Sequence, residues 1–331
     1  MSEVIFEEST DTLLEVNSLK TYYTTKTGYV KAVDDVSLFL DRSKVLGVAG
    51  ESGCGKSTLV TTIFRVMPRN ARVMGGEVKF KGQDLLKMDL KTFRKEIVWK
   101  DIAYIPQASM DVLDPVYKVK DQMLETILAH EDVSRAEAME RIFRTLESVG
   151  VPQEKADMFP HELSGGQRQR VVIAMALLLN PSMIVSDEAT TALDVITQAK
   201  ILELMKSLQE SRKFSMMFVT HDLSLLANVS DSIAIMYAGK LVEFGDVEKV
   251  FSNPLHPYTQ LLIKAIPDLR VRKQKKLVAI PGFPPDLENP PKGCRFAPRC
   301  PLAMPVCSEK EPEFSKVEGF HYVACHAVNK K

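Results

Sequence analysis

The sequence predicts an α/β fold in which helices cover both faces of a parallel sheet. Two short apolar runs, Val45–Ala49 and Ile102–Ile105, have the length and composition of buried strands. Two further apolar runs, residues 182–186 and 215–219, are separated by an expected helix at about residues 197–210. Strands that alternate with helices are typical of a parallel sheet that is covered on both sides.

A helical region interrupts this pattern between residues 108 and 160. Residues 121–129 and 135–149 carry apolar side chains at helical spacing, with charged residues between them. Gly150 and Pro152 then end the second helix. We therefore expect a helical subdomain inserted between the strands.

Length and charge narrow the class of protein. The chain has 331 residues, with 43 basic and 43 acidic side chains and no formal net charge. Its 45% hydrophobic and 26% charged residues are ordinary globular values and argue against bulk disorder. The neutral total gives no support to general nucleic-acid binding, which usually shows as a basic domain. The length predicts about two domains.

The termini and apolar runs predict a cytoplasmic chain. No apolar run reaches the length of about 18 residues that a membrane helix needs. The acidic N-terminus lacks the basic start of a secretory signal. Any role at a membrane therefore requires a separate membrane partner.

The composition changes from about residue 253. Residues 253–301 contain ten prolines, which disfavour helices and central strands. We interpret a basic run in this segment as a solvated linker, with a contact surface as the alternative (Arg270, Arg272, Lys273, Lys275 and Lys276). Four of the five cysteines lie in the last 38 residues (Cys294, Cys300, Cys307 and Cys325). We expect them to hold a small loop-rich module together.

Residues 50–57 read GESGCGKS and match the phosphate-binding pattern G-x-x-x-x-G-K-[ST] in full. An apolar strand precedes the motif, and residues 58–66 can form the helix that follows it. The glycines let backbone amides converge on phosphate oxygens, Lys56 supplies a charge to them, and Ser57 can ligate Mg²⁺. The motif predicts a nucleoside triphosphate site. We interpret Cys54 as a small tolerated side chain, with a thiol of lowered pKa at the helix N-terminus as the alternative.

Two further strand ends carry reactive side chains. Asp187 and Glu188 follow the run at 182–186, at the end of a strand where ligands gather in open α/β sheets. Asp187 suits the Mg²⁺ shell through water, and Glu188 suits polarisation of an attacking water. His221 follows the run at 215–219 and can hydrogen-bond a γ-phosphate. A lone histidine is more often structural, but three strand ends that carry Lys56, Glu188 and His221 favour the functional interpretation.

Residues 163–167, LSGGQ, resemble the signature motif of ATP-binding cassette (ABC) ATPases. Other motifs of that family occur in the family's order: Gln107 resembles the Q-loop, residues 192–194 the D-loop and His221 the switch histidine. The resemblance covers about residues 12–250.

The resemblance implies a P-loop NTPase fold of the ABC cassette type, with a RecA-like core, an antiparallel β subdomain and an inserted α-helical subdomain. The first part of the core and the β subdomain are expected at 1–107, and the helical signature subdomain at 108–165. The second part of the core is expected at 166–252, followed by a Pro-rich, Cys-containing C-terminal regulatory or metal-cluster extension at 253–331.

The family's cassettes form a head-to-tail dimer that sandwiches two ATP molecules. A Ser hydroxyl, two glycines and a helix beginning at Gln167 provide a second anion-binding helix end, which would reach the ATP of the other subunit. An ordinary helix-capping serine is the alternative. The residues expected to bind ATP are Tyr23 (favoured over Tyr22 and Tyr29 as the adenine platform), Gly50, Ser52, Gly53, Gly55, Lys56, Ser57, Thr58, Ser164, Gly165, Gly166, Gln167 and Asp194. The expected catalytic residues are Glu188, His221 and Gln107, and the expected Mg²⁺ ligands are Ser57, Gln107 and Asp187.

The tail resembles one branch of importers. HPYT at 256–259, IPGFPP at 280–285 and GCRFAPRCP at 293–301 resemble the peptide/nickel importers, and more narrowly the D-type ATPase subunit of oligopeptide or dipeptide permeases. That family implies a homologous F-type ATPase subunit, two transmembrane permease subunits and an extracytoplasmic substrate-binding protein. The chain would then lie peripherally at the cytoplasmic face of the membrane and energise peptide import. Oligosaccharides or nickel are the alternative solutes.

Two positions depart from the family pattern. Ala189 stands where proline usually follows the catalytic glutamate, and Thr191 stands where serine is usual. Neither change removes a charge or a phosphate ligand, so hydrolysis is still expected, with a looser turn after Glu188.

The spacing of the four tail cysteines bears on what they bind. They are separated by 5, 6 and 17 residues, which matches neither the closely spaced pairs of structural zinc sites nor the bacterial ferredoxin run. The wide spacing and Pro301 after Cys300 favour an iron–sulfur cluster, and the family resemblance supports a structural [4Fe–4S] cluster. Zinc and free or disulfide-bonded cysteines are the alternatives. His321 and His326 are interpreted as surface or packing residues.

Two other classes of protein compete with the importer ATPase. A soluble ABC protein that acts on nucleic acid or ribosomes usually has a coiled-coil insertion or two cassettes, and this sequence has neither. A nearly inactive regulatory subunit is disfavoured because Asp187, Glu188, Ser164 and His221 are all present.

Overall fold

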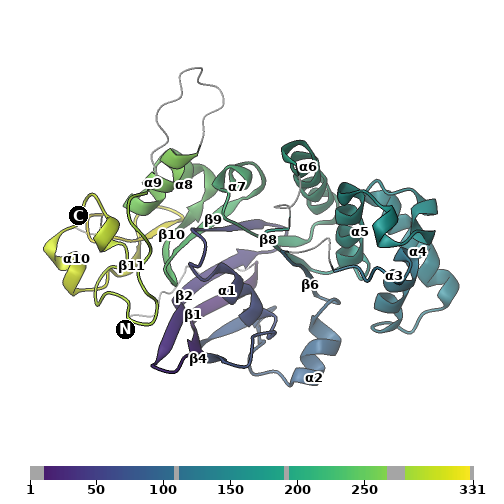
Figure 1. The fold of residues 1–331 in the computed structure, drawn as a ribbon, viewed down its shortest axis with the longest axis horizontal. Helices are drawn as coiled ribbons and strands as arrows, with labels where there is room; N and C mark the ends of the chain where they lie inside the picture. Colours follow the sequence, from purple (N-terminus) through teal and green to yellow (C-terminus); the bar gives the residue numbers. More distant parts are fainter. Residues whose placement is uncertain (1–10, 108–111, 190–193, 267–279, 329–331) are drawn as a thin grey trace, which may run out of the picture. The chain divides into compact units, whose positions relative to one another are not determined.

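The computed structural model describes residues 11–107, 112–189, 194–266 and 280–328 (Figure 1). The chain divides into two units. The first consists of Met1–Lys87 and Phe218–Lys331, and the second of Met88–Met217. Within the described residues, no helix has the length and apolar character that crossing a membrane requires.

The N-terminal part of the first unit is an antiparallel sheet in the order β2–β1–β4–β5. β1 (Thr12–Thr24) pairs with β2 (Tyr29–Asp41) on one side and with β4 (Ala71–Phe80) on the other, and β4 pairs with the short β5 (Gln83–Asp84). This sheet confirms the expected antiparallel β subdomain.

A second group of strands in the first unit positions the phosphate loop. β3 (Val45–Ala49) runs parallel to β9 (Ser232–Tyr237), which pairs antiparallel with β10 (Lys240–Asp246). β3 is buried at every position, which explains its uninterrupted apolar sequence. The helices of this part are α1 (Lys56–Ile63), α7 (Leu223–Val229) and α8 (Val247–Ser252).

The last part of the C-terminal extension, coloured yellow in Figure 1, continues this sheet. β12 (His321–Ala324) pairs with β10, and β11 (Phe314–Lys316) pairs with β12. The short helix η5 (Ala297–Arg299) lies between Cys294 and Cys300, and α10 (Pro305–Glu309) contains Cys307. The tail therefore has a strand component that its sequence did not reveal.

One expectation for the Pro-rich segment is wrong. Although the prolines of residues 253–301 predict no helix, α9 (Pro257–Ala265) forms there. Pro257 occupies the first position of the helix, where its missing N–H removes no hydrogen bond. His256 caps the helix, because its Nδ1 accepts a hydrogen bond from the backbone N–H of Tyr258 at 3.0 Å. Whether a helix forms here therefore depends on the position of the prolines and not on their number.

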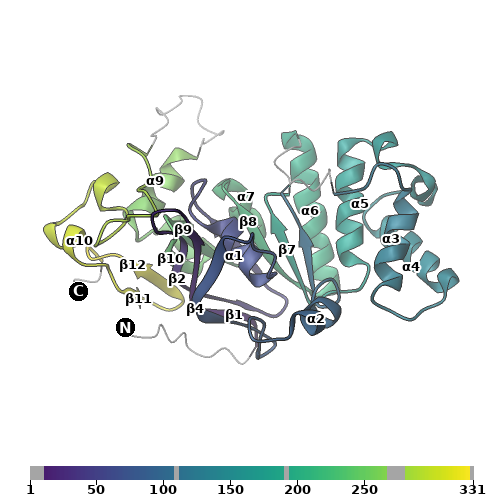
Figure 2. The same ribbon diagram turned by 60° about the horizontal axis from the view of Figure 1, so that its bottom comes forward.

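The second unit contains two parallel strands and a group of helices. β6 (Ile102–Ile105) runs parallel to β7 (Met183–Asp187). Figure 2 shows α3 (Val119–Leu128), α4 (Arg135–Ser148) and α5 (Gly165–Leu177) side by side, and α5 also contacts α6 (Val195–Arg212). Short helices complete the unit: α2 (Leu90–Thr92), η1 (Phe93–Ile97), η3 (Gln153–Asp157) and η4 (Pro160–Glu162). β8 (Ser215–Thr220) spans the boundary between the two units in the sequence.

The observed elements follow the predicted ones closely. Both Val45–Ala49 and Ile102–Ile105 are strands with the predicted bounds. The runs at 182–186 and 215–219 correspond to β7 and β8, and the helices predicted at 121–129, 135–149 and 197–210 correspond to α3, α4 and α6. The helix predicted at 58–66 begins earlier, at Lys56, and ends at Ile63.

Candidate nucleotide site

Two glycines of the phosphate loop are required by the backbone around them. A Cβ at Gly50 would lie 2.1 Å from the carbonyl oxygen of Met236, and a Cβ at Gly55 would lie 2.0 Å from that of Ala32. Gly55 also has a φ of +107°, which other residues rarely adopt. The loop leads into the N-terminus of α1, and that helix end favours a bound anion.

Lys56 is held in place by hydrogen bonds to the backbone of the phosphate loop. Lys56 is 5% exposed, and its Nζ donates to the carbonyl oxygens of Gly50 at 2.8 Å and Glu51 at 3.2 Å. Ser52, Gly53 and Ser57 are exposed. The loop thus combines a fixed ammonium group with accessible positions, as a polyphosphate site needs.

Tyr23, the predicted adenine platform, lies at the end of β1 beside the first turn of α1. It is half-buried, and its hydroxyl lies 3.0 Å from Oγ1 of Thr58. Tyr22 instead donates its hydroxyl to the carboxylate of Asp34, and Tyr29 is exposed. Of the three aromatic candidates, Tyr23 is the one that contacts the helix of the phosphate loop.

Cys54 does not have the reactive thiol of the alternative interpretation. Its side chain is buried, and burial raises the pKa of the thiol. The nearby Lys56 ammonium acts in the opposite direction but is the smaller effect. These observations disfavour the alternative of a lowered pKa and agree with the favoured interpretation of Cys54 as a small tolerated side chain.

In the second unit, the structure brings together the Q-loop glutamine and the predicted catalytic carboxylate. Nε2 of Gln107 donates to Oε2 of Glu188 at 3.0 Å. The two residues follow the parallel strands β6 and β7, whose carboxyl ends lie together. Glu188 has a φ of +47°, an uncommon conformation for a residue other than glycine.

Asp187 is buried at the end of β7, next to an aromatic hydroxyl. Its side chain accepts a hydrogen bond from Tyr104 at 3.4 Å, and Tyr104 lies on the neighbouring β6. Burial is the main cause that raises the pKa of Tyr104, and the Asp187 carboxylate adds to it. The hydroxyl therefore stays protonated and can continue to donate to Asp187.

The signature motif forms a helix N-terminus with reciprocal capping. Oγ of Ser164 accepts from the backbone N–H of Gln167 at 3.3 Å, and Oε1 of Gln167 accepts from the N–H of Ser164 at 3.0 Å. The helix begins at Gly165 and not at Gln167, because Ser164 takes the capping position. Ser164 is exposed, so it caps the helix and still faces solvent.

Asp194 and His221 both lie at the starts of helices. Asp194 caps α6 through hydrogen bonds from the backbone of Ile196 at 3.1 Å and Thr197 at 3.0 Å. The hydroxyl of Thr197 donates to the same carboxylate and is the main cause that lowers its pKa. His221 directly follows β8 and is exposed. Thr191 and residues 192–193 of the predicted D-loop lie outside the described residues.

The four tail cysteines line one pocket, together with His256 and His326 among other residues (Cys294, Cys300, Cys307 and Cys325). Burial raises the pKa of Cys294 to about 11, and the thiols of Cys307 and Cys300 add to this effect. All five cysteines of the chain are free. Among the described residues, however, no three or more His, Cys, Asp or Glu side chains are arranged to hold a metal ion. The observed geometry therefore does not support the expected cluster ligands, nor the alternative zinc site.

The two tail histidines have partners within the protein. Nε2 of His321 lies 2.8 Å from Oε1 of Glu243, and both side chains are buried. Nε2 of His326 lies 2.8 Å from the carbonyl oxygen of Lys310. These contacts agree with their interpretation as packing or surface residues.

The residues that join the extension to the phosphate loop were not predicted from the sequence. Arg299 binds the carboxylate of Glu51, and the hydroxyl of Tyr258 binds the backbone N–H of Glu51. Both residues belong to motifs that mark the tail, at 256–259 and 293–301. The motifs indicated the branch of the family, but they did not indicate that these side chains contact Glu51.

The fold and the phosphate loop define an ATP-binding cassette. The family model described as ABC transporter matches residues 33–191, and the model described as oligopeptide/dipeptide transporter, C-terminal region, matches residues 242–307. Among solved structures, the ADP- and Pi-bound dimeric ATP-binding cassette MJ0796 has a TM-score of 0.63 and 26% identity, covering 71% of this chain and 99% of its own.

Two curated relatives narrow the class. The dipeptide transport ATP-binding protein DppD of Caldanaerobacter subterraneus subsp. tengcongensis is 42% identical over 316 residues, which cover 95% of this chain and 96% of the relative. The oligopeptide transport ATP-binding protein OppD of Bacillus subtilis is 45% identical over 314 residues, covering 94% and 87%. The chain belongs to the oligopeptide/dipeptide family of ABC transporter ATP-binding proteins. The predicted family, the cassette fold and the ATPase class are thereby confirmed.

Proposed function

We propose that this chain binds and hydrolyses ATP to drive the import of dipeptides or oligopeptides through a membrane permease. The phosphate loop carries the proposal, since Gly50 and Gly55 allow a close backbone approach and Lys56 is fixed at the loop. The relatives named for dipeptide and oligopeptide transport support the peptide class of solute.

The residues predicted to act on ATP divide the chemistry among them. The Ser57 hydroxyl and the Asp187 carboxylate are oxygen donors of the kind that Mg²⁺ takes, so they would hold the ion. When bound, the ion neutralises charge on the β- and γ-phosphates. Glu188 polarises the attacking water, and the 3.0 Å hydrogen bond from Gln107 holds its carboxylate in place. His221 would hydrogen-bond the γ-phosphate.

The signature helix end acts on the ATP of a second cassette. Ser164 is exposed at the N-terminus of α5, where backbone amides and the helix dipole favour an anion. In this arrangement the chain pairs head to tail with a homologous F-type ATPase subunit. The pair sits at the cytoplasmic face of the membrane on two permease subunits, which receive solute from an extracytoplasmic binding protein.

We further propose that the four tail cysteines hold a [4Fe–4S] cluster. They line one pocket, which supports a common ligand, and a cluster spreads its thiolates more widely than a single tetrahedral ion does. Binding would release the thiol protons, including that of Cys294, whose pKa is raised to about 11. Iron and acid-labile sulfide in anaerobically purified protein are the expected result. Zinc at full occupancy without iron would refute the cluster.

The substitution Glu188→Gln tests the assigned chemistry. The amide keeps the size of the side chain and its contact with Gln107 but cannot polarise water as a carboxylate does. We expect ATP binding to persist and turnover to fall by about 10²-fold or more. Unchanged turnover, measured as phosphate release from the assembled transporter, would refute Glu188 as the base.

A further inference from the structure

The C-terminal extension binds the phosphate loop through the second residue of that loop. Nη1 and Nη2 of Arg299 donate to the two carboxylate oxygens of Glu51 at 2.7 Å and 3.0 Å. The Arg299 side chain is 5% exposed and that of Glu51 is 26% exposed, so the pair is largely shielded from water. A bidentate pair of this kind fixes orientation as well as charge.

Arg299 is itself positioned from several directions. Its Nε donates to the carbonyl oxygen of Pro281 at 2.8 Å, and its Nη1 donates to the hydroxyl of Tyr237 at 3.2 Å. The guanidinium carbon also lies 5.7 Å from the centre of the Tyr237 ring, within the range of a cation–π contact. The guanidinium group is therefore fixed before any ligand arrives.

A second contact holds the backbone of the same loop residue. The hydroxyl of Tyr258 accepts a hydrogen bond from the N–H of Glu51 at 2.9 Å. Tyr258 is fully buried on α9, and its ring lies 4.6 Å from that of Tyr237. The carbonyl oxygen of Glu51 in turn accepts from Nζ of Lys56 at 3.2 Å. Glu51 thus connects the extension to the lysine that would bind phosphate.

We propose that Arg299 is a positioning residue for nucleotide binding, which neutralises Glu51 and fixes the loop segment that holds Lys56. The inference rests on ATP binding at residues 50–57, as proposed above. An unneutralised carboxylate at the second loop position would repel the phosphates of ATP and leave this segment free to move. Arg299 directly precedes Cys300. A well-ordered cysteine segment should therefore raise the affinity for ATP, and bound ATP should in turn stabilise the cysteine segment.

A double-mutant design separates this role from a merely structural one. We expect Arg299→Met to raise the Kd for ATP about tenfold, within the range that coupled sites show. Adding Glu51→Gln to that variant removes the unpaired charge and should return the Kd to within about threefold of the wild type. Arg299→Lys keeps the charge without the bidentate geometry and should lie between them. The measurement is equilibrium binding of a fluorescent ATP analogue to the full-length chain, with the Tm recorded in parallel.

Arg295→Met is the matched control. Arg295 is as buried as Arg299, at 7% exposed, and also joins the extension to the cassette. Its partners are the carboxylate of Asp34 and the carbonyl oxygens of Lys31 and Ala238, all of them outside the phosphate loop. We expect this variant to lose stability while its Kd for ATP stays within about twofold of the wild type.

The possible results are distinct. The proposal is supported if Arg299→Met binds the ATP analogue about tenfold more weakly and the added Glu51→Gln restores the affinity. An unchanged Kd in Arg299→Met, no rescue in the double variant, or equal weakening by Arg295→Met overturns it. If the wild-type chain does not bind the analogue at all, the proposed function fails as well, and that result is recognised before any variant is compared.

Discussion

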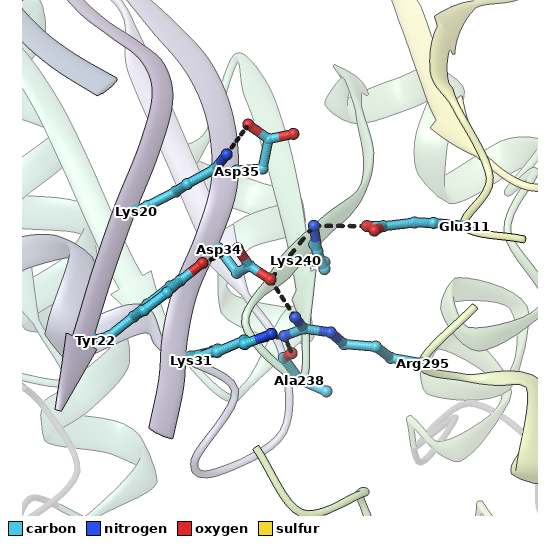
Figure 3. Close-up of polar contacts among 9 residues, drawn as sticks. All are labelled: Lys20, Tyr22, Lys31, Asp34, Asp35, Ala238, Lys240, Arg295 and Glu311. Atoms are coloured by element: carbon cyan, nitrogen blue, oxygen red, sulfur yellow. Dashed lines mark hydrogen bonds and ion pairs between the residues drawn. The ribbon is translucent and has the colours of Figure 1, made fainter. Parts of the chain in front are cut away.

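Replacing Arg295 by methionine should destabilise the first unit through a buried ion-pair network. Figure 3 shows the guanidinium group of Arg295 against the carboxylate of Asp34, with Lys240 and Tyr22 on the same carboxylate. Arg295 also donates to the carbonyl oxygen of Ala238 at 2.5 Å. The variant therefore removes one partner of a buried carboxylate and one donor to a buried carbonyl.

The remaining contacts of Asp34 set the size of the effect. Removing one partner from a buried ion pair costs about 3–5 kcal/mol. Burial by itself would raise the pKa of Asp34, but Lys240, the Tyr22 hydrogen bond and Arg295 together lower it. Lys240 and Tyr22 remain in the variant, and Lys31 adds a smaller favourable effect, so we expect the lower end of the range, about 3 kcal/mol. At about 2–4 °C for each kcal/mol in a domain of this size, the Tm should fall by about 6–12 °C.

Lys20→Met is the control for this prediction. Lys20 pairs with Asp35 in the same region at 3.6 Å, but the two side chains are 26% and 38% exposed (Figure 3). A pair so open to water should contribute less than about 1 kcal/mol. Urea unfolding followed by circular dichroism gives both free energies. If the two variants lose the same stability within about 0.5 kcal/mol, the argument from burial is refuted.

Three further predictions concern the loop, a buried histidine and the cysteines. Gly55→Ala should raise the Kd for ATP about 10²-fold, since its Cβ would lie 2.0 Å from a carbonyl oxygen and displace the loop; near-normal affinity in a titration would contradict this. Burial lowers the pKa of His256 to about 4, so the unfolded state binds more protons below about pH 6.5. Stability should therefore fall as the pH drops from about 6.5 towards 4, by up to about 3 kcal/mol. His256→Asn, which keeps a capping side chain, should lack this part of the pH dependence of stability. If urea unfolding gives the variant and the wild type the same dependence of the free energy of unfolding on pH, the assignment to His256 is refuted. Cys300→Ser should abolish iron incorporation in anaerobic preparations; full iron content in that variant would exclude Cys300 as a ligand.

The sequence predicted best what depends on local pattern. The strands Val45–Ala49 and Ile102–Ile105 were found with the predicted bounds, because uninterrupted apolar runs leave little choice of register. The phosphate loop was equally clear in the sequence. Its glycines are required where the backbone passes close to another segment, as Gly55 does to Ala32. The helix α9 was missed because the count of prolines hid the favourable position of Pro257.

Contacts between distant segments could not be predicted from the sequence. Arg299 lies 248 positions from Glu51, and the sequence near either residue does not indicate the other. The alternative interpretation of Cys54, a thiol of lowered pKa, could not be decided from the sequence for a related reason, because its burial depends on packing that the loop motif does not encode. The reciprocal capping of Ser164 and Gln167 was visible in principle, as a serine followed three residues later by glutamine.

Coupling between ATP turnover and solute movement tests the central claim most directly. The chain would be assembled with its companion ATPase and permease subunits in lipid vesicles, with the binding protein and a labelled peptide on the side opposite the ATPases. We predict that peptide uptake requires ATP, that the loaded binding protein accelerates phosphate release, and that Glu188→Gln stops both processes while ATP remains bound. Peptide uptake that continues without ATP, or in the Glu188→Gln assembly, would contradict the account.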